Sequence, residues 1–82
     1  MRAADVVTVA QIRADLRSGR AREAREATRA AQREIALALG VTRAAVSHWE
    51  SGRSVPSAEH ALAYGRLLGR LAKARAAGSP GR

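Results

Sequence analysis

Cysteine and phenylalanine do not occur in the 82 residues of this chain, and tryptophan and tyrosine occur once each. Because there is no cysteine, the protein has no disulfide and no thiolate metal site, which is compatible with a reducing compartment. Bulky apolar residues are also few, because twenty of the residues are alanine. A chain of this length buries only about 60–65% of the surface that it exposes when unfolded, so its core must be thin. Alanine is the best helix former, and this composition favours closely packed helices.

Long apolar runs are absent as well. No stretch approaches the ~18 residues that a membrane-spanning helix needs, and the apolar residues 6–10 are too few for a signal peptide. We therefore expect a cytoplasmic protein without contact to a membrane. The larger apolar side chains, which we expect to supply the core, are Ile12, Leu16, Ile35, Leu37, Leu39, Trp49, Leu62, Leu67, Leu68 and Leu71.

Acidic residues are scarce, since seven Asp and Glu stand against fifteen Lys and Arg, which gives a net charge of +8. Such a positive balance favours a polyanion, either nucleic acid or an anionic membrane surface. All but one of the basic residues are arginine, the side chain that binds phosphate and guanine bidentately. A GC-rich genome would also raise the ratio of arginine to lysine, but it does not explain the surplus of positive charge.

We expect one all-helical domain over residues 1–77 and a disordered tail at 78–82, which contains glycine, serine and proline. The first helix is expected to begin at Thr8, which forms a capping box with Gln11, and to end before Gly19. Gly65 and Gly69 are expected to bend or divide the last helix, although the same spacing also serves close helix packing. The five predicted helices span residues 8–18, 20–29, 32–39, 43–50 and 57–77, the last one capped by the serine at 57.

The segment 32–50 carries the functional pattern. Two short helices joined by a tight turn must cross closely, which requires a small residue at the crossing point, and Ala36 provides it. The turn requires a residue that tolerates a positive φ, and Gly40 provides it. Thr42 is a good N-cap for the second helix. This spacing predicts a helix-turn-helix.

The second helix of this pair has two unlike faces. At 100° per residue, Ala45, Val46 and Trp49 fall in one sector, which we expect to be buried. A helix whose outer face is small, polar or basic fits the major groove of DNA, which is about 12 Å wide. The outer sector holds Arg43, Ala44, Ser47, His48 and Ser51.

A longer pattern surrounds this segment and consists of Gln32, Ile35, Ala36, Leu39, Gly40, Val41, Val46, Trp49, Glu50, Ser51, Gly52, Arg53 and Pro56. With these residues the chain resembles the Cro/lambdoid phage repressor (XRE) family of helix-turn-helix proteins over about residues 21–71. The resemblance implies an all-α, compact five-helix lambda-repressor-like domain, here with an extra N-terminal helix. It also implies a regulator of transcription, repressor or Cro-like and of phage or prophage type, that binds specific sequences of double-stranded DNA and is no enzyme.

The resemblance further implies roles for single positions. Gln32 is expected to bind a phosphate from the start of its helix, and Arg53 to contact the DNA backbone from the following loop. Arg43 is suited to guanine O6 and N7, whereas for His48 a base and a phosphate both stay open. The expected DNA-contacting residues are Gln32, Thr42, Arg43, Ala44, Ser47, His48, Ser51 and Arg53.

Two features of the helix at 20–29 also follow from the resemblance. Arg25 matches a basic position that pairs with the acid found here at Glu50, and the pair is expected to orient the recognition helix. The chain departs from the family at 29–31, where Arg-Ala-Ala stands in place of a turn such as Gly-Leu-Ser. Because no residue there usually breaks a helix, the sequence leaves open whether the helix stops or continues for a turn.

Two expectations concern packing. Ala21 and Ala24 stand where family members commonly carry larger aliphatic residues, and we expect Ile12 and Leu16 of the first helix to fill that volume. DNA-binding domains that read half-sites usually act as dimers. The candidate dimer contact, which alternatively only completes the core, is the stripe of Leu67, Leu68 and Leu71.

Other functions are less well supported. Ser47 and His48 are adjacent on a helix and do not face one another, so no hydrolase triad is expected. No spacing indicates a metal site or another cofactor. RNA binding is disfavoured because exposed aromatic residues for base stacking are lacking. The alternative that stays open is an antitoxin, a protein-interaction module that also regulates its own gene through DNA binding.

Overall fold

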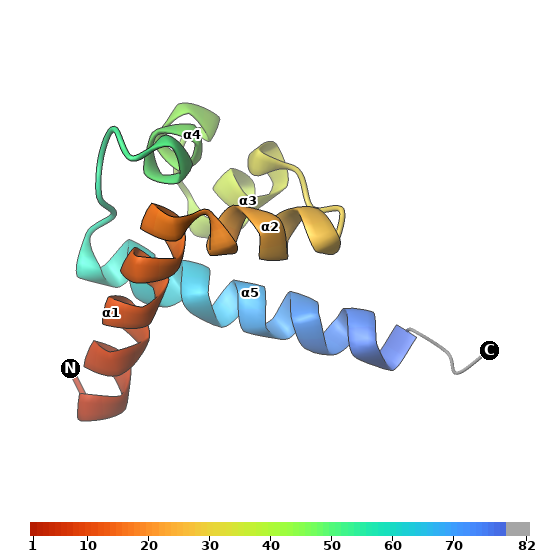
Figure 1. Cartoon of the computed structure of the whole chain (residues 1–82), viewed down its shortest axis with the longest axis horizontal. Helices are drawn as coiled ribbons and strands as arrows, with labels where there is room; N and C mark the ends of the chain where they lie inside the picture. Colours follow the sequence, from red (N-terminus) through yellow and green to blue (C-terminus); the bar gives the residue numbers. More distant parts are fainter. Residues whose placement is uncertain (79–82) are drawn as a thin grey trace.

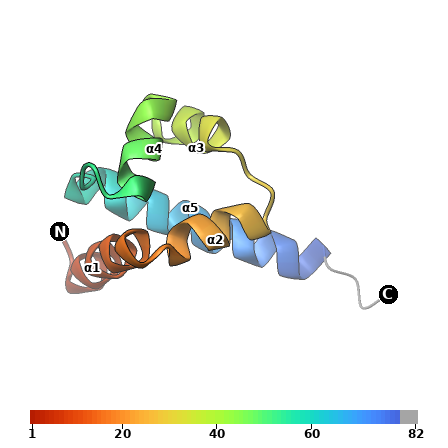
Figure 2. The ribbon, with the colours of Figure 1, turned by 45° about the horizontal axis from the view of Figure 1, so that its top comes forward.

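The computed structural model describes residues 1–78, which form five α-helices and no strand. Figure 1 shows α1 crossing α5, the longest helix, and α3 and α4 lying together on one side of α5. The turned view in Figure 2 shows the same separation of α3 and α4 from α1, α2 and α5. The all-helical prediction is confirmed. The helices are α1 (Ala3–Ser18), α2 (Arg20–Ala27), α3 (Gln32–Leu39), α4 (Arg43–Ser51) and α5 (Ala58–Gly78).

The predicted start of α1 is wrong. The helix begins at Ala3, five residues before Thr8, and the hydroxyl of Thr8 donates to the carbonyl of Ala4 within the helix at 3.0 Å. The β-branched residues that follow Asp5 have no strand to pair with, and Val9 gains burial as part of the helix, where it is 5% exposed. A threonine that bonds back to the preceding turn is an ordinary interior residue of a helix and no cap.

The connection from α2 to α3 answers the question that the sequence left open, because α2 ends at Ala27. Arg29 has φ 59°, and among residues 1–78 it is the one non-glycine residue with positive φ. Its N–H donates to Glu26 at 2.9 Å, and the N–H of Ala30 donates to the carbonyl of Arg25 at 3.3 Å, which is a Schellman ending. Arg29 therefore ends α2 in the left-handed conformation that glycine usually supplies at this position.

α5 is a single uninterrupted helix, so Gly65 and Gly69 do not divide it. Ser57 caps it as predicted, since its hydroxyl accepts from the N–H of His60 at 3.2 Å. A Cβ at Gly65 would lie 3.1 Å from Cγ2 of Thr8, whereas nothing lies within 4 Å of one at Gly69. The first glycine thus lets α1 approach α5, which is the close-packing alternative.

The core lies where α1, α4 and α5 meet α2 and α3. Ile12 and Leu16 are each 4% exposed and share the core with Ala21, as expected, but Ala24 remains exposed. Leu37 is 72% exposed and lies outside the core, contrary to the prediction. The other predicted leucines pack against the core from partly buried positions. The buried apolar residues are Val9, Ile12, Leu16, Ala21, Ile35, Ala36, Val46, Trp49, Ala61 and Tyr64.

The ends of the domain differ slightly from the prediction. α5 continues to Gly78, one residue beyond the expected boundary, and the remaining residues of the expected tail, 79–82, lie outside the described residues. Within residues 1–78, no helix combines the length and the apolar character that crossing a membrane requires.

Candidate nucleic-acid interface

The turn between α3 and α4 has the geometry that its residues predict. Gly40 has φ 72°, and the next N–H, of Val41, donates to the carbonyl of Ala36 at 3.0 Å. Thr42 has an extended backbone, and its hydroxyl accepts from the N–H of Ala45 at 3.1 Å. The predicted N-cap is thereby confirmed, and α4 leaves the turn at a fixed angle to α3.

α4 separates its two faces as predicted. Val46 is 0% exposed and Trp49 is 6% exposed, while Ala45 is partly buried beside them. The indole ring packs against the rings of Tyr64 and His60, at centroid distances of 6.2 and 5.7 Å, so it does not serve to stack bases. The outer face is open except for Ser47, which is partly buried, and its exposed members are Arg43, Ala44, His48 and Ser51.

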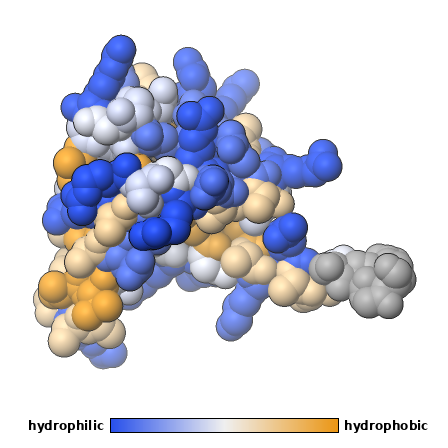
Figure 3. All heavy atoms as spheres, in the orientation of Figure 1, coloured by the Kyte–Doolittle hydropathy of each residue, from blue (hydrophilic) through white to orange (hydrophobic). Residues whose placement is uncertain are grey.

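The loop after α4 holds Arg53 against the end of the helix. Gly52 has φ 81°, and the N–H of Arg53 donates to the carbonyl of His48 at 2.9 Å. The far end of the loop is anchored to α1, because the guanidinium of Arg13 donates to the carbonyl of Pro56 at 3.0 and 3.3 Å. The side chain of Arg53 stays exposed. Figure 3 shows hydrophilic side chains projecting from the end of the molecule that carries α3 and α4.

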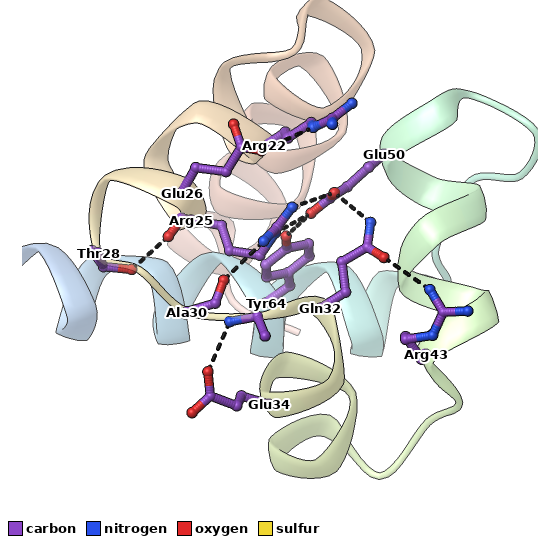
Figure 4. Close-up of polar contacts among 11 residues, drawn as sticks. Arg22, Arg25, Glu26, Thr28, Ala30, Gln32, Glu34, Arg43, Glu50 and Tyr64 are labelled. Carbon is purple, nitrogen blue, oxygen red and sulfur yellow. Dashed lines mark hydrogen bonds and ion pairs between the residues drawn. The ribbon is translucent and has the colours of Figure 1, made fainter.

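Gln32 lies at the start of α3, between the outer face of α4 and the interior (Figure 4). Its amide donates to Oε1 of Glu50 at 2.9 Å and its carbonyl accepts from Nη1 of Arg43 at 3.4 Å. Two residues that were expected separately at the interface are therefore in contact. The amide nitrogen of Gln32 points inward, to Glu50, and its carbonyl holds the side chain of Arg43 at the start of α4.

A buried polar cluster lies directly behind this interface (Figure 4). Arg25 binds Glu50 bidentately, with Nε 2.7 Å from Oε2 and Nη2 2.9 Å from Oε1, and its Nη1 donates to the carbonyl of Ala30 at 2.8 Å. The side chains of Arg25 and Glu50 are 8% and 2% exposed. The structural pair implied by the family resemblance is thus present. Its bidentate geometry satisfies both charges, which a buried ion pair requires.

Tyr64 is the member of this cluster that the sequence prediction missed. Its hydroxyl donates to Oε2 of Glu50 at 2.8 Å, and its ring is fully buried. The available signal was its spacing from Ala61 and Leu68, three residues before it and four after it, which places it on the same side of the last helix. Burial and the hydrogen bond to the carboxylate both raise the pKa of Tyr64, so the phenol keeps its proton and stays a donor.

The protonation states of the ion pair follow from the same contacts. Burial alone raises the pKa of Glu50, but hydrogen bonds from Arg25, Gln32 and Tyr64 outweigh it, and the pKa lies below its ordinary value of 4.5. The hydrogen bond to Glu50 likewise raises the pKa of Arg25. The pair is therefore fully charged at neutral pH. Among residues 1–78, no buried side-chain nitrogen or oxygen lacks a hydrogen-bond partner.

Two other expectations can be placed on the structure. Leu67, Leu68 and Leu71 are partly buried and pack against the core, which favours the alternative that they complete it. In the described part of the chain, no three side chains of the kinds that bind metals come together. The polar groups gathered behind α4 are paired with one another and hold the helix in position.

A family model described as helix-turn-helix matches residues 22–72. No curated protein and no solved structure matches the chain. The matched segment is more than half of the chain and begins inside α2, so α1 lies outside it. The chain belongs to the XRE-type helix-turn-helix family of DNA-binding regulators.

Proposed function

We propose that this protein regulates transcription by reading specific sequences in the major groove of double-stranded DNA with α4. The observation that carries the proposal is the division of α4 into two faces. Trp49 is 6% exposed on the inner face, while Arg43 and His48 are exposed on the outer one. A helix held in this way can enter the groove with a slim, basic edge.

Each outer residue has a chemistry suited to one part of the duplex. Arg43 can bind guanine O6 and N7 bidentately, which discriminates against other bases by about 1–3 kcal/mol. Ala44 offers a methyl group to the methyl of thymine. Arg53, Thr42 and Ser51 lie at the ends of α4 and are suited to the phosphates on either side. His48 can donate to a base edge or to a phosphate.

The regulator is proposed to be a repressor or a Cro-like protein of phage or prophage type. Such proteins gain affinity by binding two half-sites as a dimer, about 34 Å apart along the duplex. The net charge of +8 adds phosphate contacts that carry no sequence information. Specificity is therefore assigned to the few side chains of α4, and affinity largely to the surrounding arginines.

Selection of bound duplexes from a random pool tests the proposal directly. We expect enrichment of one short motif, and two-fold symmetry of the motif would show that two copies bind together. Recovery of duplexes without any common motif would contradict sequence-specific recognition. A protein that binds no duplex until a protein partner is added would favour the antitoxin alternative.

A further inference from the structure

The exposed apolar side chains of the domain are concentrated at the start of α1. Met1, Val6 and Val7 are 72%, 54% and 66% exposed and make up three of the five large exposed hydrophobic residues within residues 1–78. Figure 1 shows the first turns of α1 extending past α5, away from α3 and α4. Figure 3 shows hydrophobic surface at the same place. At 100° per residue the two valines lie in one sector of the helix together with two exposed alanines. We call this surface the α1 face; it consists of Ala3, Val6, Val7 and Ala10.

The opposite side of α1 is also apolar, because Val9, Ile12 and Leu16 are buried in the core. A helix in a small domain usually has one apolar side, which faces the core, and a polar side toward solvent. Exposed valines are moreover poor helix formers, since the branched side chain loses rotamer freedom. The helix begins after Arg2 without a side-chain cap. The burial of Val9 and the ion pair between Asp5 and Arg66 hold this part of α1 in place, but neither accounts for the exposed valines, which gain burial only if something packs on them.

The charge distribution indicates a second copy of this chain as the occupant. The whole chain carries +8, so two copies repel one another wherever their arginines meet. α1 is balanced, with Asp5 and Asp15 against Arg13 and Arg17. The α1 face contains no charged residue, and Arg17, the exposed charge in the same sector, lies two turns beyond Ala10. A contact through this face brings no like charges together. Nucleic acid, by contrast, gains nothing from a neutral apolar surface.

The shape of the surface fits a self-complementary contact. Beside the ridge formed by the valines lies an open crevice of about 380 Å³ between α1, α2 and α5. Its walls include the apolar residues Val7, Ala24 and Leu68. The two charged residues that line it, Asp15 and Arg20, pair with one another at 3.2 Å. A two-fold contact requires a projection and a recess on the same surface, and the α1 face and this crevice adjoin. We propose that the α1 face is the contact between two copies of this chain, with valines of each copy seated in the crevice of the other.

The α1 face lies on the opposite side of α5 from α3 and α4 (Figure 1). A dimer formed through this face therefore leaves α4 accessible in both copies. One helix face and one crevice make a small interface, so we expect a weak dimer with a dissociation constant on the order of micromolar. The pairing itself does not depend on the proposed function. The use of the dimer, which is to present two α4 helices to two DNA half-sites, does rest on the proposed function.

Sedimentation equilibrium without DNA measures the pairing. We expect the unmodified protein to pass from monomer to dimer as its concentration rises, and Val7→Asp to weaken the dimer more than tenfold. Val7 is 66% exposed, and valine and aspartate have similar helix propensities, so circular dichroism should show nearly unchanged helicity. Leu37→Asp is the matched control, since Leu37 is also 72% exposed, and it should leave the association unchanged.

The absence of cysteine allows a second measurement. Oxidation of Val7→Cys should give a disulfide-linked dimer much faster than oxidation of Leu37→Cys, because only the first pair of thiols is held together. Equal rates of cross-linking, or a protein that stays monomeric at millimolar concentration, would overturn the proposed contact. Neither result bears on DNA recognition, whose failure would appear instead as random recovery in the duplex selection.

Discussion

The hydroxyl of Tyr64 donates a 2.8 Å hydrogen bond to Oε2 of Glu50, which connects α5 to the last turn of α4. The same carboxylate accepts from Arg25 in α2 and from Gln32 in α3. Four helices therefore converge on one buried charge. Because a carboxylate accepts hydrogen bonds only in particular directions, this convergence fixes the orientation of α4 as well as its place.

Tyr64→Phe tests how much the hydrogen bond from Tyr64 to Glu50 contributes to the stability of the fold. The ring and its packing against Trp49 remain, so the change removes the hydroxyl alone. Since a hydrogen bond to a charged group contributes about 1.5–3 kcal/mol, we expect a loss of that size in the free energy of unfolding. Chemical denaturation monitored by circular dichroism measures it. A loss below about 0.5 kcal/mol would mean that water replaces the phenol at Glu50 without cost.

The pH dependence of stability gives a second prediction. The pKa of Glu50 in the folded protein lies below its ordinary value of 4.5, which applies when the chain is unfolded. Folding is therefore favoured by the ionised carboxylate at pH values above 4.5, and this contribution is lost as the pH falls through the lowered pKa. We expect the melting temperature to fall as the medium is acidified over that window.

Glu50→Gln provides the comparison, because it removes the titrating group. The variant is less stable, since Arg25 is left buried without its counter-charge, but its melting temperature should depend less on pH over the same window. Glu26→Gln is the matched control: Glu26 is exposed, with a side chain 53% accessible, and its removal should leave the slope close to that of the unmodified protein. A carboxylate titration of Glu50 by NMR with a midpoint at or above 4.5 would contradict the prediction.

Much of the interface could be predicted because its causes are local. The positive φ at Gly40, the cap at Thr42 and the inner face with Trp49 depend on residues within one or two turns of each other. The Tyr64 and Arg13 contacts join residues 14 and 43 positions apart, and no periodicity reports such a pairing. The start of α1 was mispredicted for a different reason, since the hydroxyl of a threonine bonds equally well as a cap or to the preceding turn.

The end of α2 could not be predicted from the local sequence either, because arginine is an ordinary helix former and does not mark a helix end. Arg29 adopts φ 59° at the same Schellman position that Gly40 occupies after α3. A left-handed conformation costs a residue with a Cβ about 1–2 kcal/mol, and glycine avoids this cost while losing more entropy on folding. We expect Arg29→Gly to raise the free energy of unfolding by about 0.5–1 kcal/mol.

Arg70→Gly is the control for that substitution. It also removes an exposed arginine side chain, but from an ordinary helical position in the middle of α5. Glycine inside a helix costs roughly 0.5–1 kcal/mol, so the two variants should move the melting temperature in opposite directions. If both lower it, the backbone at position 29 stores no strain that glycine relieves.

The prediction that bears most directly on DNA recognition is that Arg43 reads a base and Arg53 contacts the phosphate backbone. Both side chains are exposed at opposite ends of α4, so alanine at either position should leave the fold intact. Arg43→Ala should lose about 1–3 kcal/mol of discrimination at a single base pair, because a bidentate contact to guanine is removed. Arg53→Ala should weaken binding to all duplexes alike and lower the salt dependence of the binding constant by about one phosphate contact.

Fluorescence anisotropy with the selected duplex, a single-base variant of it and a random duplex separates the two effects at several salt concentrations. The unmodified protein should discriminate among the three, and Arg53→Ala should keep that discrimination at lower affinity. Arg43→Ala should bind the selected duplex and its single-base variant almost equally. If both substitutions weaken specific and random duplexes by the same factor, neither arginine reads sequence, and specificity must then come from the shape of the DNA.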